Sequence, residues 1–358
     1  MSWLLLLVST LLVLISVWVV VPAPVMWAVV LSVGGSELSP LLLAASVVTG
    51  LLAWRTGGAM HTKTMVLALI ATALFAVPIV RYPRQAPFSF RRLVTGLENT
   101  DVQMHRAIIA PGAQSDFSLA IDVYQPPAGD HHPVLVQIYG GAWQRGAPGD
   151  NAAFARYFAS RGYAVFAIDY RHAPAAHWPA QIEDVRSALT WVRAHAADYK
   201  ADAARLAIIG RSAGAQLAMI AGFEDPGVSA VIDYYGPVNL TRAWHEPPRP
   251  DPIGSRSVLE AYLGGTPDQL PEPYKAASPI EHLSARVPPT LLIYGGRDHI
   301  VQAKYGRDLH AHLLAAGATS QFVEIPWADH AFDGIPGGLA GQLSLWYTEQ
   351  FLEQTLRR

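Results

Sequence analysis

The stretch Leu206-Ala207-Ile208-Ile209-Gly210-Arg211-Ser212-Ala213-Gly214 decides the fold of this 358-residue chain. An apolar run of strand length leads into a G-x-S-x-G motif, and a helical pattern over Ala213–Ala221 follows at once. The two glycines permit a tight turn from strand to helix, which exposes the Ser212 hydroxyl at the carboxyl edge of a sheet. The adjoining helix N-terminus favours negative charge beside that hydroxyl. The motif therefore predicts a serine nucleophile carried by an α/β sheet.

The surrounding sequence, over residues 101–358, alternates short β-rich runs with longer helical patterns. The middle runs are continuously apolar, which is typical of a parallel sheet covered by helices on both faces, whereas the first two alternate more and favour an antiparallel edge hairpin. We therefore expect an α/β layered fold with a mostly parallel central sheet. The predicted strands are Val102–Ile109, Leu119–Tyr124, Val134–Tyr139, Ala164–Ile168, Leu206–Ile209, Ala230–Tyr234, Thr290–Tyr294 and Gln321–Ile325, and the predicted helices are Asn151–Ser160, Pro179–Ala196, Ala213–Ala221, Ala303–Ala316 and Leu339–Thr355.

Between residues 236 and 288 this alternation gives way to Pro-rich sequence around one predicted helix, Ser255–Leu263. A long irregular insertion in a compact domain is usually functional. We expect this insertion to form part of a lid.

A serine hydroxyl needs a general base, and the base needs an acid that orients it. His330 and Asp298 are the candidates for these roles. Each follows a predicted strand and therefore falls at the same sheet edge as Ser212. The rival bases are His299, His310 and His312, and the fallback acids are Asp329 and Asp333.

The turn Tyr139-Gly140-Gly141-Ala142-Trp143 follows another predicted strand and supplies the third candidate element. Its small residues allow the backbone N–H groups of Gly141 and Ala142 to approach a substrate oxygen, and the N–H of Ala213 adds a third donor. Such donors stabilise a developing oxyanion, and removing one typically costs about 2.7–4 kcal/mol of transition-state stabilisation.

Residues 116–335 resemble the α/β-hydrolase superfamily. They look most like the hormone-sensitive-lipase-like esterases and the group that contains feruloyl-esterase-like, kynurenine-formamidase-like and isoprenylcysteine-methylesterase-like enzymes. The resemblance implies an α/β-hydrolase fold and hydrolysis of carboxylic esters through Ser212, His330 and Asp298. The matching segments are Tyr139–Trp143, Asp169-Tyr170-Arg171, Pro179–Val185, Gly210–Gly214, Asp298–Val301 and His330.

Two positions depart from the hormone-sensitive-lipase-like pattern: Tyr139 replaces a histidine and Ala142 replaces a third glycine. A tyrosine at the first position is similar to the isoprenylcysteine-methylesterase-like group, so the subfamily and the substrate stay open. The resemblance further implies that Asp169, Arg171 and Asp184 are scaffold residues.

Residues 1–82, here called the head, contain only four charged side chains, namely Glu37, Arg55, Lys63 and Arg81. The uncharged runs Trp3–Val21, Leu38–Trp54 and Thr64–Val80 have lengths near those needed to cross a bilayer. We therefore expect about three transmembrane helices, with two or four as the alternatives, a linker at residues 83–100 and the α/β body at residues 101–358. A cleaved signal peptide is the alternative for the first run, although no Lys or Arg precedes it. Val25–Val33 is too short to span alone, and either extends the first helix past a kink or lies re-entrant or interfacial.

The distribution of basic residues gives the expected orientation of these spans. Arg81, Arg84, Arg91 and Arg92 lie on the side of the body, against Arg55 and Lys63 in the opposite loop. The positive-inside rule then favours a cytoplasmic body.

The composition excludes several other classes of function. A net charge of −2 disfavours nucleic-acid binding, and the absence of cysteine excludes thiol catalysis and Cys-ligated metals. No metal-ligand motif and no Gly-rich phosphate loop occur, so we expect no cofactor and no metal. The expected partner is an ester, lipid-like or presented at the bilayer. The alternatives are an amidase, formamidase or peptidase with the same triad, an acyltransferase, and a non-catalytic membrane scaffold.

Overall fold

The computed structural model describes residues 1–97, 102–109 and 117–356. The end of the predicted linker, residues 98–100, and the first residue of the predicted body lie outside this range. In the body, the described residues form one eight-stranded sheet with the order β1-β2-β4-β3-β5-β6-β7-β8. The predicted edge hairpin is confirmed, because β1 pairs antiparallel with β2, which pairs antiparallel with β4. All later pairs are parallel. The strands are β1 Gln103–Ile109, β2 Leu119–Gln125, β3 His132–Ile138, β4 Ala164–Ile168, β5 Ala201–Arg211, β6 Ala230–Tyr234, β7 Thr290–Gly295 and β8 Ser320–Ile325.

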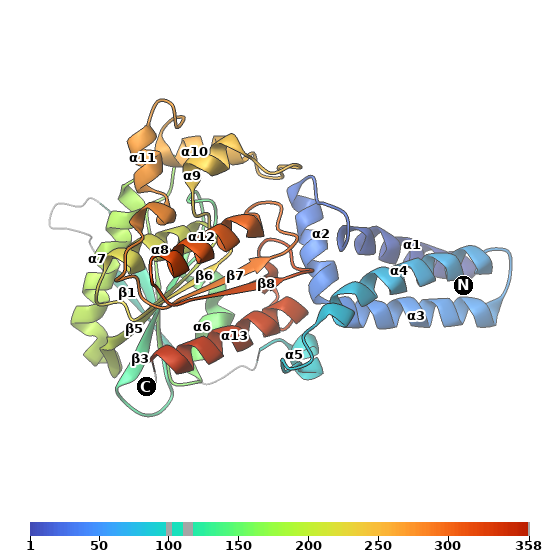
Figure 1. Cartoon of the computed structure of the whole chain (residues 1–358). Helices are drawn as coiled ribbons and strands as arrows, with labels where there is room; N and C mark the ends of the chain where they lie inside the picture. Colours follow the sequence, from blue (N-terminus) through green and yellow to red (C-terminus); the bar gives the residue numbers. More distant parts are fainter. Residues whose placement is uncertain (98–101, 110–116, 357–358) are drawn as a thin grey trace.

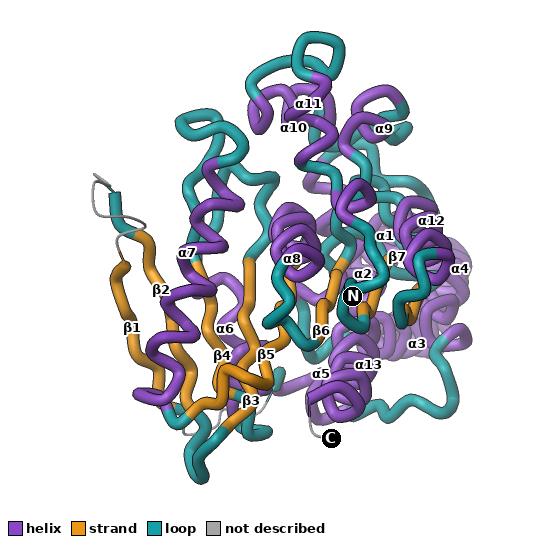
Figure 2. Tube along the Cα trace, turned by 60° about the vertical axis from the view of Figure 1, so that its left-hand side comes forward, coloured by secondary structure: helices purple, strands orange, loops and turns teal. Residues whose placement is uncertain are grey.

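Helices cover both faces of this sheet, as the apolar strands predict. Figures 1 and 2 show α7, α8 and α12 on one face and α6 and α13 on the other. Every residue of β3, β4, β6 and β7 is buried between these layers. The helices are α6 Ala152–Ala159, α7 Ala180–His195, α8 Ala213–Glu224, α12 Ala303–Ala315 and α13 Leu339–Leu356, and the short helices are η1 Pro148–Asn151, η2 Ala196–Tyr199, η3 Pro279–His282 and η4 Phe332–Gly334.

The insertion at residues 236–288 contains three α-helices, which gather beyond the carboxyl ends of the strands (Figure 1), and the short helix η3. The predicted helix is present as α10, Ser255–Leu263. Two short helices, α9 Leu240–His245 and α11 Pro271–Ala276, flank it in the sequence. Neither was predicted, because six residues are too few to establish a 3.6-residue period. The side chain of Asn239 caps α9 by accepting a hydrogen bond from the N–H of Arg242.

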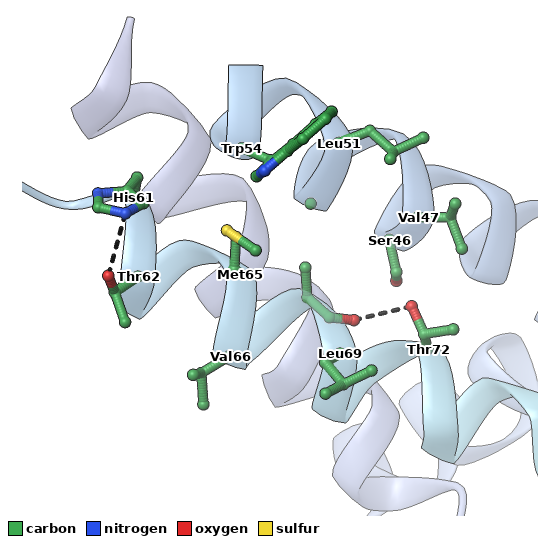
Figure 3. A pocket seen from close by; sticks show the side chains of 12 residues that line it. Ser46, Val47, Leu51, Trp54, His61, Thr62, Met65, Val66, Leu69 and Thr72 are labelled. Carbon is green, nitrogen blue, oxygen red and sulfur yellow. Dashed lines mark hydrogen bonds between the residues drawn. The ribbon is translucent and has the colours of Figure 1, made fainter. Parts of the chain in front are cut away.

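The head contains four helices, α1 Ser2–Trp18, α2 Met26–Glu37, α3 Ser39–Thr56 and α4 His61–Arg81, and α5 Phe90–Thr95 follows in the linker. In Figure 1, α1, α3 and α4 lie side by side and extend away from the body, with the N-terminus and the α3–α4 loop at the far end. Two of them, α3 and α4, are long and apolar enough to cross a membrane, whereas α1 has 17 residues and is shorter than that measure. Many of their outward side chains are apolar, and a groove of about 810 Å³ between α3 and α4 has a mainly apolar lining (Figure 3).

The chain after α1 differs from one of the predicted alternatives. The helix ends at Trp18, short of the predicted Val21. Pro22 and Pro24 follow, and residues that precede proline are disfavoured in helical conformation. The chain then turns, and α2 stands across the bundle axis instead of continuing α1 (Figure 1). The interpretation of Val25–Val33 as an extension of the first helix is therefore wrong.

Contacts at both ends of α2 join the head to the body. Before α2, the carbonyl of Val20 accepts a hydrogen bond from Arg297 Nη1 at 2.8 Å. At the end of α2, the fully buried Glu37 accepts a hydrogen bond from the N–H of Gly341 at 2.9 Å. Gly341 lies in the first turn of α13, where free N–H groups and the helix dipole favour a carboxylate. The head is therefore docked on the body through α2.

Candidate active site

Ser212 lies at the sharp turn between β5 and α8, as the motif predicts. Its backbone has φ 51° and ψ −120°, which few non-glycine residues adopt. Its N–H donates to the carbonyl of Tyr234 at 2.9 Å, which holds the turn against the neighbouring strand β6. Glycine is required at both ends of the motif: a Cβ at Gly210 or Gly214 would lie 2.2 Å from a backbone oxygen. The turn therefore presents the hydroxyl while α8 starts directly behind it.

Hydrogen bonds join the three residues predicted as nucleophile, base and acid. Ser212 Oγ lies 3.0 Å from His330 Nε2, and His330 Nδ1 lies 2.7 Å from Asp298 Oδ2. His330 follows β8 and Asp298 follows β7, so the parallel sheet brings both loops to one edge. Asp298 Oδ1 accepts hydrogen bonds from the N–H groups of Ile300 at 2.8 Å and Val301 at 2.7 Å. The carboxylate is thus fixed on one side by its own loop and on the other by the imidazole.

The surroundings of His330 stabilise its protonated form. Burial lowers the pKa of the imidazole. The charge of Asp298 and its hydrogen bond raise the pKa by more than burial lowers it, so the pKa of His330 lies above the ordinary histidine value. Asp329 and Asp333 act in the same direction through their charges. An imidazole in this setting gains a proton readily and holds the resulting charge against a carboxylate.

The rival residues have other partners. His299 faces Asp329 at 3.6 Å, His310 bonds to Ser320, and His312 bonds to a carbonyl of its own helix. The Asp329 carboxylate also accepts a hydrogen bond from the backbone N–H of His330 at 2.8 Å, so it braces the histidine loop. Among the described residues, the side-chain hydrogen bond to the Ser212 hydroxyl comes from His330 and not from these rivals.

Gly141, Ala142 and Ala213 lie around Ser212, and their backbone N–H groups have no acceptor within the described residues. Gly141 and Ala142 have φ values of 125° and 56°, so this turn curls back in the left-handed region. The strand-end loop also packs on the serine turn, since a Cβ at Gly140 would lie 2.8 Å from the carbonyl oxygen of Arg211. These three N–H groups are thus available to an oxygen atom bound beside Ser212.

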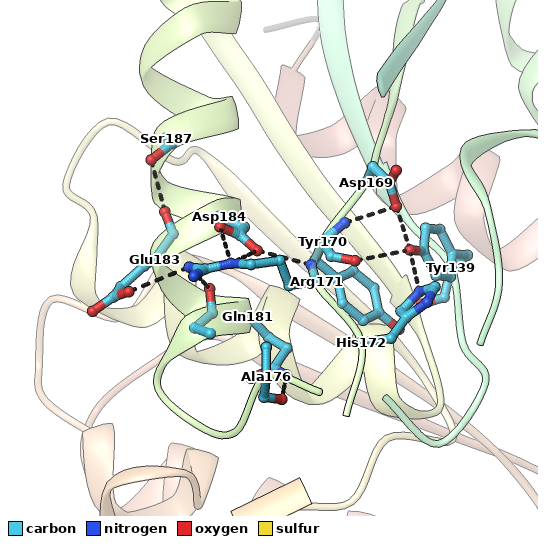
Figure 4. Close-up of polar contacts among 11 residues, drawn as sticks. Tyr139, Asp169, Tyr170, Arg171, His172, Ala176, Gln181, Glu183, Asp184 and Ser187 are labelled. Atoms are coloured by element: carbon cyan, nitrogen blue, oxygen red, sulfur yellow. Dashed lines mark hydrogen bonds and ion pairs between the residues drawn. The ribbon is translucent and has the colours of Figure 1, made fainter. Parts of the chain in front are cut away.

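Tyr139 anchors this loop from behind. Its hydroxyl donates to Asp169 and also lies 2.9 Å from His172 Nε2, while its ring stacks on Tyr170 with centroids 4.5 Å apart (Figure 4). Burial raises the pKa of Tyr139, so the hydroxyl stays a donor. The residue that departs from the hormone-sensitive-lipase-like pattern is therefore a structural support of the loop.

Arg171 and Asp184 form a second polar contact, beside that of Tyr139 and Asp169 (Figure 4). Asp184 is buried and accepts hydrogen bonds from the side chain of Arg171 at 2.9 Å and from its backbone N–H at 2.8 Å. This pair ties the segment after β4 to α7.

Sequence reasoning missed a buried ion pair next to Ser212. The guanidinium of Arg211 pairs with Asp333, which also accepts a hydrogen bond from the hydroxyl of Tyr235. Arg211 and Asp333 are 4% and 8% exposed, and the guanidinium lies 4.3 Å from the ring centroid of Phe154. Arg211 occupies a variable position of G-x-S-x-G, and no local pattern connects it to an acid more than a hundred residues later. The pair links the serine turn to the loop that carries His330.

Two cavities of very different size meet at Ser212. A small cavity of about 60 Å³ lies beneath the insertion, with Trp143, Pro237, Val258, Leu259 and Ile300 among its lining residues. A larger cavity of about 640 Å³ holds Ser212 and His330 and has a more polar lining that includes Arg145, Asp150 and Asn151.

Comparison with known proteins places the body in a family. The family model described as BD-FAE matches residues 121–313, more than half of the chain. The esterase LipQ of Mycobacterium tuberculosis is 34% identical over 241 residues, which cover 62% of this chain and 56% of LipQ. The chain therefore spans little more than half the length of that relative.

Solved structures share the fold. A bacterial heroin esterase superposes with a TM-score of 0.66 at 23% identity. The superposition covers 75% of this chain and 89% of the esterase chain. The propionate-bound form of the esterase Est2 from the Planctomycetes species Thermogutta terrifontis has a TM-score of 0.57 at 26% identity and covers 69% of this chain and 93% of its own. With an α/β-hydrolase sheet and a family match that contains both Ser212 and Asp298, this chain belongs to the BD-FAE family of α/β-hydrolases.

Proposed function

We propose that this protein is a membrane-anchored serine hydrolase that cleaves carboxylic esters. The observation that carries the proposal is the unbroken series of hydrogen bonds from Ser212 through His330 to Asp298. Ser212 Oγ attacks the ester carbonyl while His330 Nε2 takes its proton, and Asp298 holds the imidazole in the required tautomer. The N–H groups of Gly141, Ala142 and Ala213 receive the oxyanion.

The remaining steps follow from the same groups. His330 returns the proton to the departing alcohol, which leaves an acyl group on Ser212. Water, deprotonated by His330, then attacks the acyl-enzyme and releases the carboxylic acid. Likeness to the esterase LipQ supports an ester in preference to an amide.

The small cavity indicates the size of the acyl group. A cavity of about 60 Å³ is well below the roughly 150 Å³ that accommodates benzene in a protein core. It suits an acyl chain of a few carbons, and the relative Est2 has been solved with propionate bound. The insertion that roofs this cavity acts as the lid of the acyl site.

The head serves as the anchor. We infer that α1, α3 and α4 cross the bilayer together, because at 1.5 Å per residue α3 and α4 reach about 27 and 32 Å. Leu7, Val48, Leu51 and Leu69 are among their many exposed apolar side chains. The basic residues Arg81, Arg84, Arg91 and Arg92 then favour a cytoplasmic body.

Activity is tested with a chain-length series of p-nitrophenyl esters on the detergent-solubilised full chain. We expect the fastest hydrolysis with acetate to butyrate, and loss of activity in Ser212→Ala. A fluorophosphonate probe should label Ser212 in the wild type and not in the variant. Activity that survives Ser212→Ala would refute the mechanism. Labelling without ester hydrolysis would favour an amide substrate, and neither labelling nor hydrolysis by folded protein would favour a non-catalytic role.

The topology is tested separately, and the absence of native cysteine makes the experiment direct. Single cysteines are introduced at Lys63, in the first turn of α4 at the far end of the bundle, and at Arg84, beside the body. A membrane-impermeant maleimide added to intact cells should label Lys63→Cys and spare Arg84→Cys. The reverse pattern would overturn the cytoplasmic orientation, and equal labelling would overturn the membrane-spanning arrangement.

A further inference from the structure

The head contributes a wall to the cavity that contains Ser212. Met26, the first residue of α2, lines the larger cavity together with Ser212 and His330, although more than 180 residues separate it from either. Figure 1 shows α2 standing between the bundle and the carboxyl edge of the sheet, where β7 and β8 end. The family match begins at residue 121, so this wall lies outside the family's shared segment.

The wall is held in place at both ends. The Val20 carbonyl before α2 is bonded to Arg297, and Glu37 at its end is bonded to the start of α13. Between them, α2 packs against the short helix Phe332–Gly334, which follows His330 in the chain. α2 is therefore fixed across the cavity mouth.

The outer side of this wall is apolar. Met26, Trp27 and Val30 are 37%, 60% and 65% exposed. The indole of Trp27 meets that of Trp18 edge to face, with ring centroids 5.6 Å apart, at the end of α1 nearest the body. Exposed tryptophans at the end of an apolar bundle are typical of the depth where lipid headgroups begin. The cavity mouth therefore lies at the membrane surface when the bundle spans the bilayer.

The two cavities divide a substrate into unlike halves. The smaller, mainly apolar cavity accepts a short acyl chain, whereas the larger one offers Arg145, Asp150 and Asn151 to a polar group and includes Met26 in its lining. A soluble alcohol would need no apolar rim at the mouth. An alcohol with a polar headgroup and a hydrocarbon tail satisfies both the polar lining and the apolar rim.

We propose that the substrate is a short-chain O-acyl ester carried on the polar headgroup of a membrane amphiphile, and that Met26 contacts the amphiphile where it enters the cavity. This inference rests on the proposed esterase function. Ser212 takes the acyl group, the headgroup hydroxyl leaves with the proton from His330, and water releases the short carboxylic acid. The amphiphile itself stays in the bilayer.

The test uses the full chain in phospholipid nanodiscs and three probes. Dodecyl 6-O-acetylglucoside is compared with methyl 6-O-acetylglucoside, which lacks the tail, and p-nitrophenyl acetate reports the basal reaction. Met26→Trp narrows the mouth, and Val30→Trp adds the same ring one helical turn away, outside the cavity lining. We expect Met26→Trp to lower kcat/KM on the dodecyl ester about tenfold. The control Val30→Trp should change kcat/KM on the same ester by less than about twofold.

The outcomes separate this inference from the proposed function. If p-nitrophenyl acetate is hydrolysed but Met26→Trp leaves the dodecyl ester unaffected, the amphiphile does not pass Met26 and the inference is wrong. A dodecyl ester no better than the methyl ester would also overturn it. Absence of all hydrolysis and of fluorophosphonate labelling would instead refute the esterase proposal itself.

Discussion

The buried pair Arg211–Asp333 gives a prediction that can be worked from the structure. Arg211 directly precedes the nucleophile and Asp333 follows the histidine loop, so their contact closes the back of the site. Arg211→Met keeps much of the side-chain volume but removes the guanidinium. Asp333 is then left as a buried carboxylate, with the hydroxyl of Tyr235 as its remaining donor. Arg211→Met/Asp333→Leu removes both charges together.

The expected magnitude follows from burial. Removing one partner of a buried ion pair costs about 3–5 kcal/mol, whereas replacing both with apolar residues of similar volume is often close to neutral. Both side chains here are less than a tenth exposed, so screening by solvent is small. At about 2–4 °C per kcal/mol for a domain of this size, Arg211→Met should lower Tm by about 6–20 °C. The double variant should recover most of that loss.

Thermal unfolding of the full chain in detergent measures this difference. Asp333→Asn adds a second readout, because Asp333 contributes charge that raises the pKa of His330. Removing that charge lowers the pKa, and the acidic limb of the kcat/KM profile should move to lower pH. A single variant as stable as the wild type, or a double variant less stable than either single one, would refute the reasoning on the buried pair.

Three further predictions concern the site and the docking of the head. The raised pKa of His330 means that the imidazole stays protonated to higher pH. The acidic limb of the kcat/KM profile for a short ester should therefore have its midpoint above pH ~6.5, the ordinary histidine value. A midpoint below that value would contradict the contact with Asp298. Gly214→Ala puts a Cβ 2.2 Å from the Tyr139 carbonyl oxygen. It should lower kcat about 100-fold or more by displacing the turn that carries Gly141 and Ala142. The matched control is Gly149→Ala, whose Cβ would have no neighbour closer than 3.8 Å and which should retain full activity. Burial raises the pKa of Glu37 well above its ordinary value, so between the ordinary and the raised pKa the folded state binds a proton that the unfolded state lacks, and the stability of the fold falls as pH rises. Glu37→Gln should flatten this pH dependence of stability. Glu37→Leu should cost about 1–3 kcal/mol of stability by leaving the Gly341 N–H unpaired, and both variants are compared by measuring Tm against pH.

Features encoded over short stretches of sequence could be predicted. The strands Ala164–Ile168 and Ala230–Tyr234 have the predicted bounds, because short β-rich, mainly apolar runs indicate buried strands. The turn at Ser212 follows from two glycines that no other residue can replace. The proximity of Ser212, His330 and Asp298 follows from topology, because strands in a parallel sheet end at one edge. Their assignment as a catalytic triad stays a proposal.

Features that depend on distant parts of the chain could not be predicted. β5 begins at Ala201 instead of Leu206 because its first residues pair with His132 and Pro133 before a shift in register, and their polar sequence gives no strand signal. The Arg211–Asp333 contact joins residues whose neighbours in sequence say nothing about each other. Burial makes such pairs matter energetically, and burial is decided by the packing of α13 and the histidine loop.

The segment Met26–Glu37 has one property that could be predicted from the sequence and one that could not. Its apolar run, Val25–Val33, is too short to span a bilayer alone, and this could be predicted from the sequence. Its position over the cavity depends on Glu37, a single acid in an apolar region. A carboxylate is costly to bury unless donors meet it. The start of α13 provides such a donor, and docking there carries Met26 to the mouth of the cavity. This buried acid at the end of α2 therefore fixes the head against the body and places Met26 at the cavity that contains Ser212.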